Sequence, residues 1–204
     1  MKKAAVIIIT VCAVFLCGCN KQPEIGDMAV ILGVTVSQNT EGGLTVSVEL
    51  AHRVNINSED KSVVVTAEAD CWQGIEEELS RKCDKKLYWG HMVVLLLSAD
   101  NTPEYSQQLL ESLYCDLRMA PLVYVAFFCG NGEELLEGGF GEAAYASQGM
   151  AQRLKSMHKE DRQLCLTLQK CMQHIYYGRK LEMAVIELAD KKGIVSGTVT
   201  VDEI

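Results

Sequence analysis

The first third of the chain carries the hydrophobic pattern of a β-hairpin with a further strand beside it. Asp27–Val36 (DMAVILGVTV) is apolar and β-branched, as is typical of a buried strand. Leu44–His52 alternates apolar and polar residues, which predicts a partner strand with one buried face and one face toward water. The polar segment Gln38–Gly43 supplies the turn, and Ser62–Ala67 (SVVVTA) predicts a short third strand. The positions expected to face water on the second strand are Thr45, Ser47 and Glu49.

The middle of the chain alternates helical and strand patterns. Asp70–Cys83 has apolar residues at helical spacing, with Asp70 as the expected N-cap. Met92–Leu97 is an unbroken apolar run, which indicates a strand covered on both faces at the centre of a sheet. A helix is expected to begin at Pro103, and Pro121–Cys129 predicts another two-sided strand. Two such strands joined by a helix indicate a parallel, right-handed βαβ unit.

The last third predicts helices followed by a second hairpin. Asn131 is expected to cap a short helix that precedes a glycine-rich joint. Glu142–His158 and Glu160–Tyr177 have the apolar spacing of a helical pair that is broken near residues 157–159. Leu181–Leu188 and Ile194–Val201 then predict two strands joined by a tight turn.

These elements predict an α+β or mixed α/β fold. We expect a central mixed sheet that includes an N-terminal antiparallel hairpin, a βαβ-like unit, a helical pair and a C-terminal β-hairpin. Residues 27–137 are expected to form an N-terminal α/β domain. Residues 138–204 then hold the helical pair and the hairpin as a second, smaller subdomain.

Residues 1–18 have the three parts of a secretory signal peptide. Lys2 and Lys3 form the basic region, and Ala4–Phe15 forms the apolar region. Leu16–Cys19 (LCGC) then resembles a bacterial lipobox, in which the thiol of Cys19 receives a diacylglyceryl group before the signal is removed. Residues 19–26 follow as a short lipidated leash, so the folded body is expected to lie close to the bilayer.

Three other interpretations of the N-terminus fit less well. An ordinary signal peptide has no better cleavage site in this stretch. A retained transmembrane helix needs about 20 apolar residues, whereas the run here is only about 15. A chance apolar helix at a cytosolic N-terminus would expose apolar residues on every side.

Composition excludes nucleic acid as a partner. The whole chain carries a net charge of −8, and removal of Lys2 and Lys3 with the signal leaves 17 basic against 27 acidic residues, a net charge of −10. Such a body repels phosphates and anionic head groups, so contact with the membrane is expected through the acyl chains. A hydrophobic content of 49% argues against disorder.

The chain has nine cysteines, three of which belong to the signal or to the acylated position. Six others permit three disulfides. Because these six lie within helical and strand patterns, we favour mostly reduced, buried thiols. They are Cys71, Cys83, Cys115, Cys129, Cys165 and Cys171.

No arrangement of residues predicts catalysis, a cofactor or a metal site. Cys165, Cys171 and His174 share one helical stretch, but a zinc site needs three or four converging ligands and no fourth ligand accompanies them. His91 begins the central strand, yet no nucleophile elbow or cysteine-protease signature accompanies it. We interpret His91 as a hydrogen-bonded structural residue and Trp89 as a core residue.

Several segments together resemble the C-subunit lipoproteins of spore germinant receptors, the Ger(x)C family. They are the lipobox Leu16–Cys19, the strand Asp27–Val36, the segment Leu87–Leu97 (LYWGHMVVLLL), the triplet 116–118 (DLR), and the turn and helix 130–136. The resemblance covers the chain from the lipobox to about Leu136. Members of the family are longer, with a separate C-terminal domain.

The resemblance implies a non-enzymatic subunit at the spore inner membrane, beside an integral-membrane A subunit and a transporter-like B subunit. Our leading hypothesis is therefore a lipid-anchored accessory subunit of a germinant-receptor-like complex that functions in spore germination. The alternatives are a lipid-anchored solute-binding or cell-envelope protein of another system, and an anchored hydrolase that would use His91 with an acid and a nucleophile.

Overall fold

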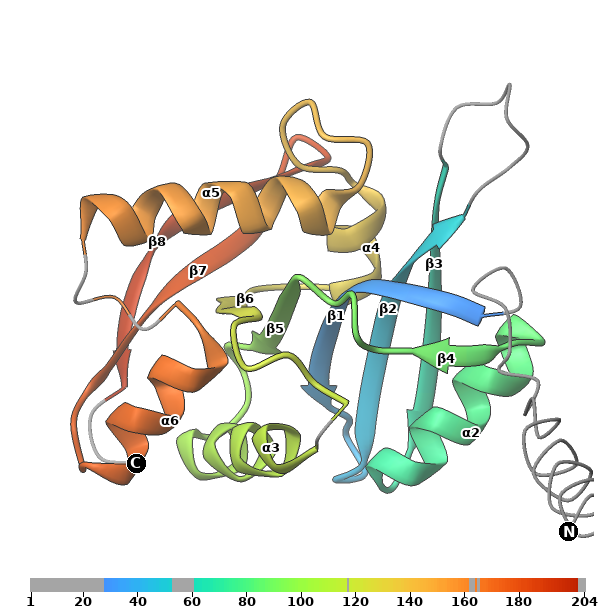
Figure 1. Cartoon of the computed structure of the whole chain (residues 1–204), viewed down its shortest axis with the longest axis horizontal. Helices are drawn as coiled ribbons and strands as arrows, with labels where there is room; N and C mark the ends of the chain where they lie inside the picture. The colour runs from blue at the N-terminus through green and yellow to red at the C-terminus, as the bar shows by residue number, and fades with distance from the viewer. Residues whose placement is uncertain (1–27, 53–60, 117, 162–163, 165, 202–204) are drawn as a thin grey trace, which may run out of the picture.

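A computed structural model describes residues 28–52, 61–116, 118–161, 164 and 166–201, and within them all the strands belong to one mixed sheet (Figure 1). The strands are β1 Met28–Gln38, β2 Leu44–His52, β3 Lys61–Ala69, β4 Lys86–Tyr88, β5 Val94–Ser98, β6 Tyr124–Phe128, β7 Leu181–Ala189 and β8 Lys192–Val201. The helices are α2 Trp72–Cys83, α3 Pro103–Cys115, α4 Gly132–Glu137, α5 Ala146–Glu160 and α6 Leu168–Tyr176.

The sheet combines two antiparallel ends with a parallel centre. The strand order is β3-β2-β1-β5-β6-β7-β8, and β4 pairs with the beginning of β1. Strands β1, β5, β6 and β7 run parallel, whereas the β1–β2–β3 and β7–β8 pairs are antiparallel. This arrangement confirms the predicted mixed fold with a hairpin at each end. The division of the chain at residue 138 stays a prediction, although β7 and β8 continue the same sheet.

Local sequence explains the turns of the β1–β2 and β7–β8 hairpins. In the first, the Oδ1 atom of Asn39 accepts hydrogen bonds from the backbone N–H groups of Glu41 and Gly43, at 3.0 and 2.7 Å. In the second, Asp190 and Lys191 both adopt positive φ angles, as a two-residue hairpin turn that matches the strand twist requires. The sequence predicted a tight turn between these strands, and the structure places it at Asp190 and Lys191, between β7 and β8.

The predicted βαβ unit is confirmed as β5–α3–β6. All five residues of β5 are buried, as expected for a strand covered on both faces. Thr102 caps α3 by accepting a hydrogen bond from the N–H of Tyr105, and Pro103 occupies the first turn. The capping prediction for the preceding helix is wrong, because α2 begins at Trp72 with Cys71 as N-cap and no side-chain capping bond.

The two helices of the last third do not form the helical pair that the sequence predicted. α5 packs over one face of the sheet through Ala146, Met150 and Leu154, whereas α6 packs over the other face through Leu168 and Cys171. Figure 1 shows α5 along one side of the sheet and α6 beside α3 on the opposite side. The break also falls later than expected, since α5 continues to Glu160.

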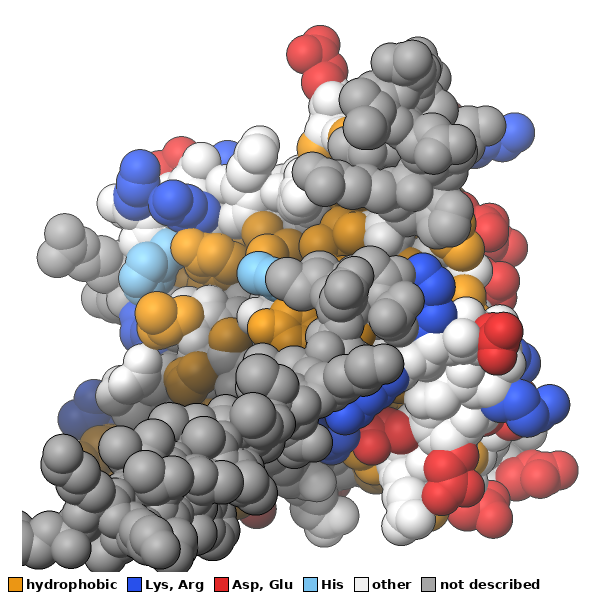
Figure 2. All heavy atoms as spheres, turned by 45° about the vertical axis from the view of Figure 1, so that its right-hand side comes forward, with side chains coloured by type: hydrophobic (Ala, Val, Ile, Leu, Met, Phe, Trp, Pro, Cys, Tyr) orange, Lys and Arg blue, Asp and Glu red, His pale blue; other side chains and the backbone are white. Residues whose placement is uncertain are grey.

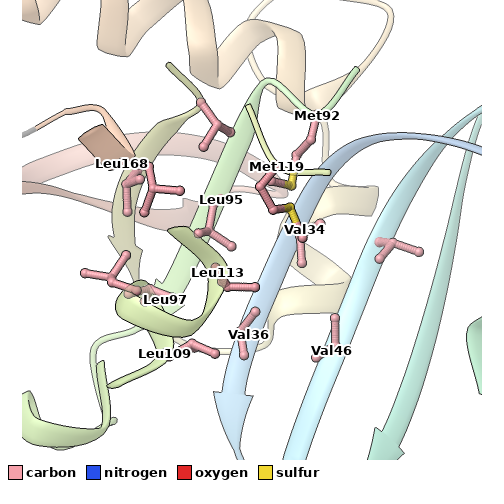
Figure 3. Close-up of a cluster of buried hydrophobic side chains, with 14 of the residues drawn as sticks. Val34, Val36, Val46, Met92, Leu95, Leu97, Leu109, Leu113, Met119 and Leu168 are labelled. Carbon is pink, nitrogen blue, oxygen red and sulfur yellow. The ribbon is translucent and has the colours of Figure 1, made fainter. Parts of the chain in front are cut away.

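The larger hydrophobic core fills the space between the sheet and helices α2, α3 and α6. In Figure 3, Leu109 and Leu113 of α3 point toward Val36 and Leu97 of the strands. Each of these side chains is at least nine-tenths buried. Burial of one such side chain contributes about 1.5–3 kcal/mol. This core fixes α3 and the loop after it against the sheet, and so positions the surface formed by the loops that precede β5 and β6.

Candidate docking surface

The loops that precede β5 and β6 lie together at the end of the sheet where the parallel strands begin. The N–H of Val93 donates to the carbonyl of Leu32 at 2.8 Å, and the N–H of Tyr124 donates to the carbonyl of Val93 at 3.0 Å. β1 enters the sheet from the same end, because Met28 pairs with Lys86 of the parallel strand β4. Strand β1 therefore begins at this end of the sheet.

An apolar groove, which we call the Leu122 groove, opens between these loops and α5. It has a volume of about 250 Å³, and its lining includes Met92, Ala120, Leu122, Tyr124, Ala151 and Lys155. The side chain of Leu122 is 69% exposed, the highest value among the exposed aliphatic residues of the described chain. A large aliphatic side chain held in water beside an apolar groove is typical of a contact surface.

Charge is distributed unevenly over the face that carries apolar surface. Figure 2 shows a band of hydrophobic side chains across the middle of one face, with histidine and Lys or Arg side chains at its margins. Asp and Glu side chains gather to one side of that band. Within the groove, Lys155 supplies the charge of the lining. The Leu122 groove is thus apolar with one basic residue in its lining, on a protein whose net charge is negative.

An ion-pair network holds the loop between α3 and β6 against α2. The guanidinium of Arg118 donates to Asp116 and to Glu76, with a distance of 2.7 Å between Nη2 and Oε1 of Glu76. The hydrogen bonds from Arg118 lower the pKa of Asp116, and the two carboxylates raise the pKa of Arg118. Glu76 also accepts from the indole of Trp72 at 3.2 Å. The DLR triplet therefore has a structural role, since it ties the α3–β6 loop to α2.

The aromatic segment before β5 is partly as predicted. Trp89 is a core residue, 3% exposed, and its ring centroid lies 5.5 Å from that of Trp72. His91 differs from the prediction, because it is exposed and makes no hydrogen bond within the described chain. Its ring instead meets Tyr88 in an edge contact with centroids 5.4 Å apart. Among the described residues, no carboxylate or hydroxyl group is bonded to His91, so the hydrolase hypothesis gains no support.

The cysteine and histidine residues of α6 do not converge. Cys171 is buried in the core, while Nδ1 of His174 lies 2.8 Å from the carbonyl oxygen of Lys180, and Cys165 lies outside the described residues. Across the described part of the chain, no group of three potential metal ligands is found.

Burial was predicted correctly for only part of the cysteine set. Cys71, Cys115 and Cys129 have free, exposed thiols, so the expectation that they are buried is wrong. Cys83 is half-buried, and burial raises its pKa. Cys19, the predicted lipidation site, lies outside the described residues, and its acylation stays a prediction.

The apolar–polar alternation of β2 did not identify Glu49 as a buried residue that caps α5. The alternation of β2 placed it on a face toward water, but its side chain is fully buried, and Ser47 is 3% exposed. Its carboxylate accepts hydrogen bonds from the N–H groups of Ala146 and Ser147, at 2.9 and 2.8 Å, and from the hydroxyl of Ser62 at 2.7 Å. Glu49 thus caps α5, whose own N-cap residue Tyr145 makes no side-chain capping bond.

A glycine permits this close approach of α5 to the sheet. A Cβ atom on Gly33 of β1 would lie 1.8 Å from Oγ of Ser147, which is far inside van der Waals contact. Gly33 and Glu49 are paired residues on adjacent strands. Together they fix the first turn of α5, and α5 forms one wall of the Leu122 groove through Ala151 and Lys155.

No helix in the described ranges is long and apolar enough to cross a membrane. No curated protein matches the sequence. The crystal structure of the GerBC protein is similar to this chain at 13% identity, over 84% of this chain and 48% of that one, with a TM-score of 0.41. The chain thus spans about half the length of that protein.

The family described as "Spore germination protein N-terminal domain" matches residues 21–188, which is most of the chain. The match extends the resemblance seen in the sequence beyond Leu136 into β7. The chain belongs to this spore germination family, in agreement with its resemblance to the N-terminal region of germinant-receptor C subunits.

Proposed function

We propose that the protein is a lipid-anchored, non-enzymatic accessory subunit of a germinant-receptor-like complex in the spore inner membrane. The family match over residues 21–188 carries this proposal, and the lipobox at Cys19 supports it. Eight residues lie between Cys19 and Met28, so the nine Cα–Cα steps that join them span at most about 32 Å. Acyl chains on Cys19 would therefore hold the body near the bilayer, on its extracytoplasmic side.

The Leu122 groove is the proposed contact with an integral-membrane receptor subunit. It lies at the end of the sheet where β1 begins, which is the end that the anchor would hold toward the membrane. An exposed leucine beside an apolar groove is suited to an apolar segment of a partner, and Lys155 is suited to a nearby acidic group.

The anchor is tested by replacing the acceptor thiol. In sporulating cells, Cys19→Ala is expected to leave unprocessed precursor and to abolish incorporation of labelled palmitate, whereas Cys71→Ala, which changes an exposed thiol of the folded body, leaves labelling intact. Continued labelling of the Cys19→Ala protein would contradict the anchor assignment.

The contact is tested separately by changing the groove. Leu122→Glu is expected to leave the protein folded and acylated but to reduce its co-purification with the integral-membrane subunits at least ten-fold, about 1.4 kcal/mol. Ile194→Glu, on the exposed face of β8 and 42% exposed in the native protein, is the matched control. Equal recovery of the membrane subunits with both variants would exclude the groove as the contact.

A further inference from the structure

We infer that a cavity between α3 and β8 is a binding site for a small, neutral organic molecule that carries a carbonyl or hydroxyl oxygen. The cavity has a volume of about 350 Å³. That is within the range of about 300–1,000 Å³ that is common for small-molecule sites. This inference concerns a different face from the Leu122 groove and does not depend on the lipid anchor.

The walls of the cavity are mainly apolar. They include Phe127 from β6, Val199 and Val201 from β8, and Pro103 from the first turn of α3. Val199 is 43% exposed. The cavity therefore opens to solvent along the edge strand, which gives a ligand a route of entry.

Two polar side chains of the lining each carry a buried atom that has no hydrogen-bond partner among the described residues. Ser106 of α3 is 3% exposed, and its hydroxyl makes no hydrogen bond within the part of the chain that the structure describes. Asn101 presents an amide nitrogen that is buried and also has no partner. Buried polar groups are nearly always paired, so two unpaired groups that line one cavity indicate a missing occupant.

The orientation of the Asn101 amide is fixed by a second contact. Its Oδ1 atom accepts a hydrogen bond from the backbone N–H of Gln38 at 3.0 Å. Because that N–H requires an acceptor, the oxygen of the amide is turned toward Gln38, and the NH₂ group is the donor left over. Asn101 therefore selects an oxygen acceptor, and the Ser106 hydroxyl can donate to a ligand oxygen or accept from a ligand hydroxyl.

The charge of the surroundings selects a neutral ligand. No ionisable side chain is among the residues described as lining the cavity. The acidic residues Asp100 and Glu104 flank its lining in sequence, and Glu104 lies in the first turn of α3. The described lining offers a carboxylate no cation to pair with, and removal of that charge from water into an apolar cavity is costly, so a neutral ligand is favoured.

Saturation-transfer NMR on the full-length protein in detergent micelles tests this site. Isovaleramide and cyclohexanone are the neutral probes, isovalerate is the anionic control, and empty micelles correct for partitioning. Both neutral probes are expected to bind and isovalerate is not. Ser106→Ala should weaken binding of isovaleramide about five- to ten-fold, the effect of one hydrogen bond. Ser112→Ala, an exposed serine on the same helix, should leave it unchanged.

Three further measurements separate a ligand site from a water-filled cavity. Ser106→Ala should keep or raise the Tm of the ligand-free protein, because it removes a buried hydroxyl with no partner, and Val199→Phe should block probe binding by filling the cavity. A crystal grown with isovaleramide should show the amide oxygen beside Asn101. Failure of both neutral probes to bind, equal binding of isovalerate, a lowered Tm for Ser106→Ala, or ordered water alone in the cavity would each overturn the inference.

Discussion

Replacement of Glu49 by alanine should destabilise the protein strongly, because its buried carboxylate is the cap of α5. The substitution removes the acceptor for the N–H groups of Ala146 and Ser147, both of which are buried. A hydrogen bond to a charged group contributes about 1.5–3 kcal/mol. Loss of both bonds therefore predicts a decrease of about 3–5 kcal/mol in the free energy of unfolding, close to the cost of leaving a buried ionic partner unsatisfied.

Urea denaturation followed by circular dichroism measures this loss. Glu49→Gln retains one carbonyl oxygen that can accept one of the two bonds, so it is expected to cost less, about 1–3 kcal/mol. Glu68→Ala changes an exposed glutamate on the neighbouring strand and should alter stability by less than about 0.5 kcal/mol. A loss below about 1 kcal/mol for Glu49→Ala, or an equal loss for Glu68→Ala, would refute the assignment of Glu49 as the cap.

Three other predictions concern the ion-pair network of Arg118, the packing of α5 on Gly33, and the accessibility of the cysteine thiols. The lowered pKa of Asp116 means that its pairing with Arg118 stabilises the fold at neutral pH and is lost as the pH falls below about 4. Thermal melts should therefore show less acid destabilisation for Asp116→Asn than for the native chain, by under about 1 kcal/mol, since Arg118 is 52% exposed. Gly33→Ala should cost about 2–3 kcal/mol in urea denaturation through its clash with Ser147, and a second change, Ser147→Gly, should recover part of that loss. Peptide mapping after alkylation should find Cys71, Cys115 and Cys129 modified in the native state and Cys171 modified only after unfolding; alkylation of native Cys171 would contradict its burial in the core.

The elements that sequence predicted well are those with a local pattern. The alternation in β2, the unbroken apolar run in β5 and the proline at the start of α3 each reflect a constraint within a few residues. Helix amphipathicity predicted α5 and α6 for the same reason. It does not say which face of the sheet a helix covers, so the predicted helical pair was wrong, and α5 and α6 lie on opposite faces.

The burial of Glu49 was missed because it depends on a distant part of the chain. Strand alternation shows that Thr45, Ser47 and Glu49 share a face, but not that α5 will return to cover it about a hundred residues later. One signal was present in the sequence, since Gly33 interrupts an otherwise β-branched strand and a glycine there marks a close backbone approach.

The candidate docking surface was only partly accessible to sequence reasoning. The Leu87–Leu97 and DLR segments carried the family resemblance; the first contributes Met92 to the groove, and the second lies two residues before Ala120 of its lining. Their roles, however, follow from contacts between segments far apart in sequence, such as Arg118 with Glu76. Leu122 lies within the predicted strand Pro121–Cys129, where a leucine is expected to be buried. In the structure β6 begins only at Tyr124, so Leu122 belongs to the loop before it.

Intact mass spectrometry of the protein purified from spore membranes tests the central proposal most directly. The expected polypeptide begins at Cys19, lacks residues 1–18, and carries the added mass of a diacylglyceryl group on its first residue. A polypeptide that still begins at Met1, or one that begins at Cys19 without added lipid mass, would contradict the account.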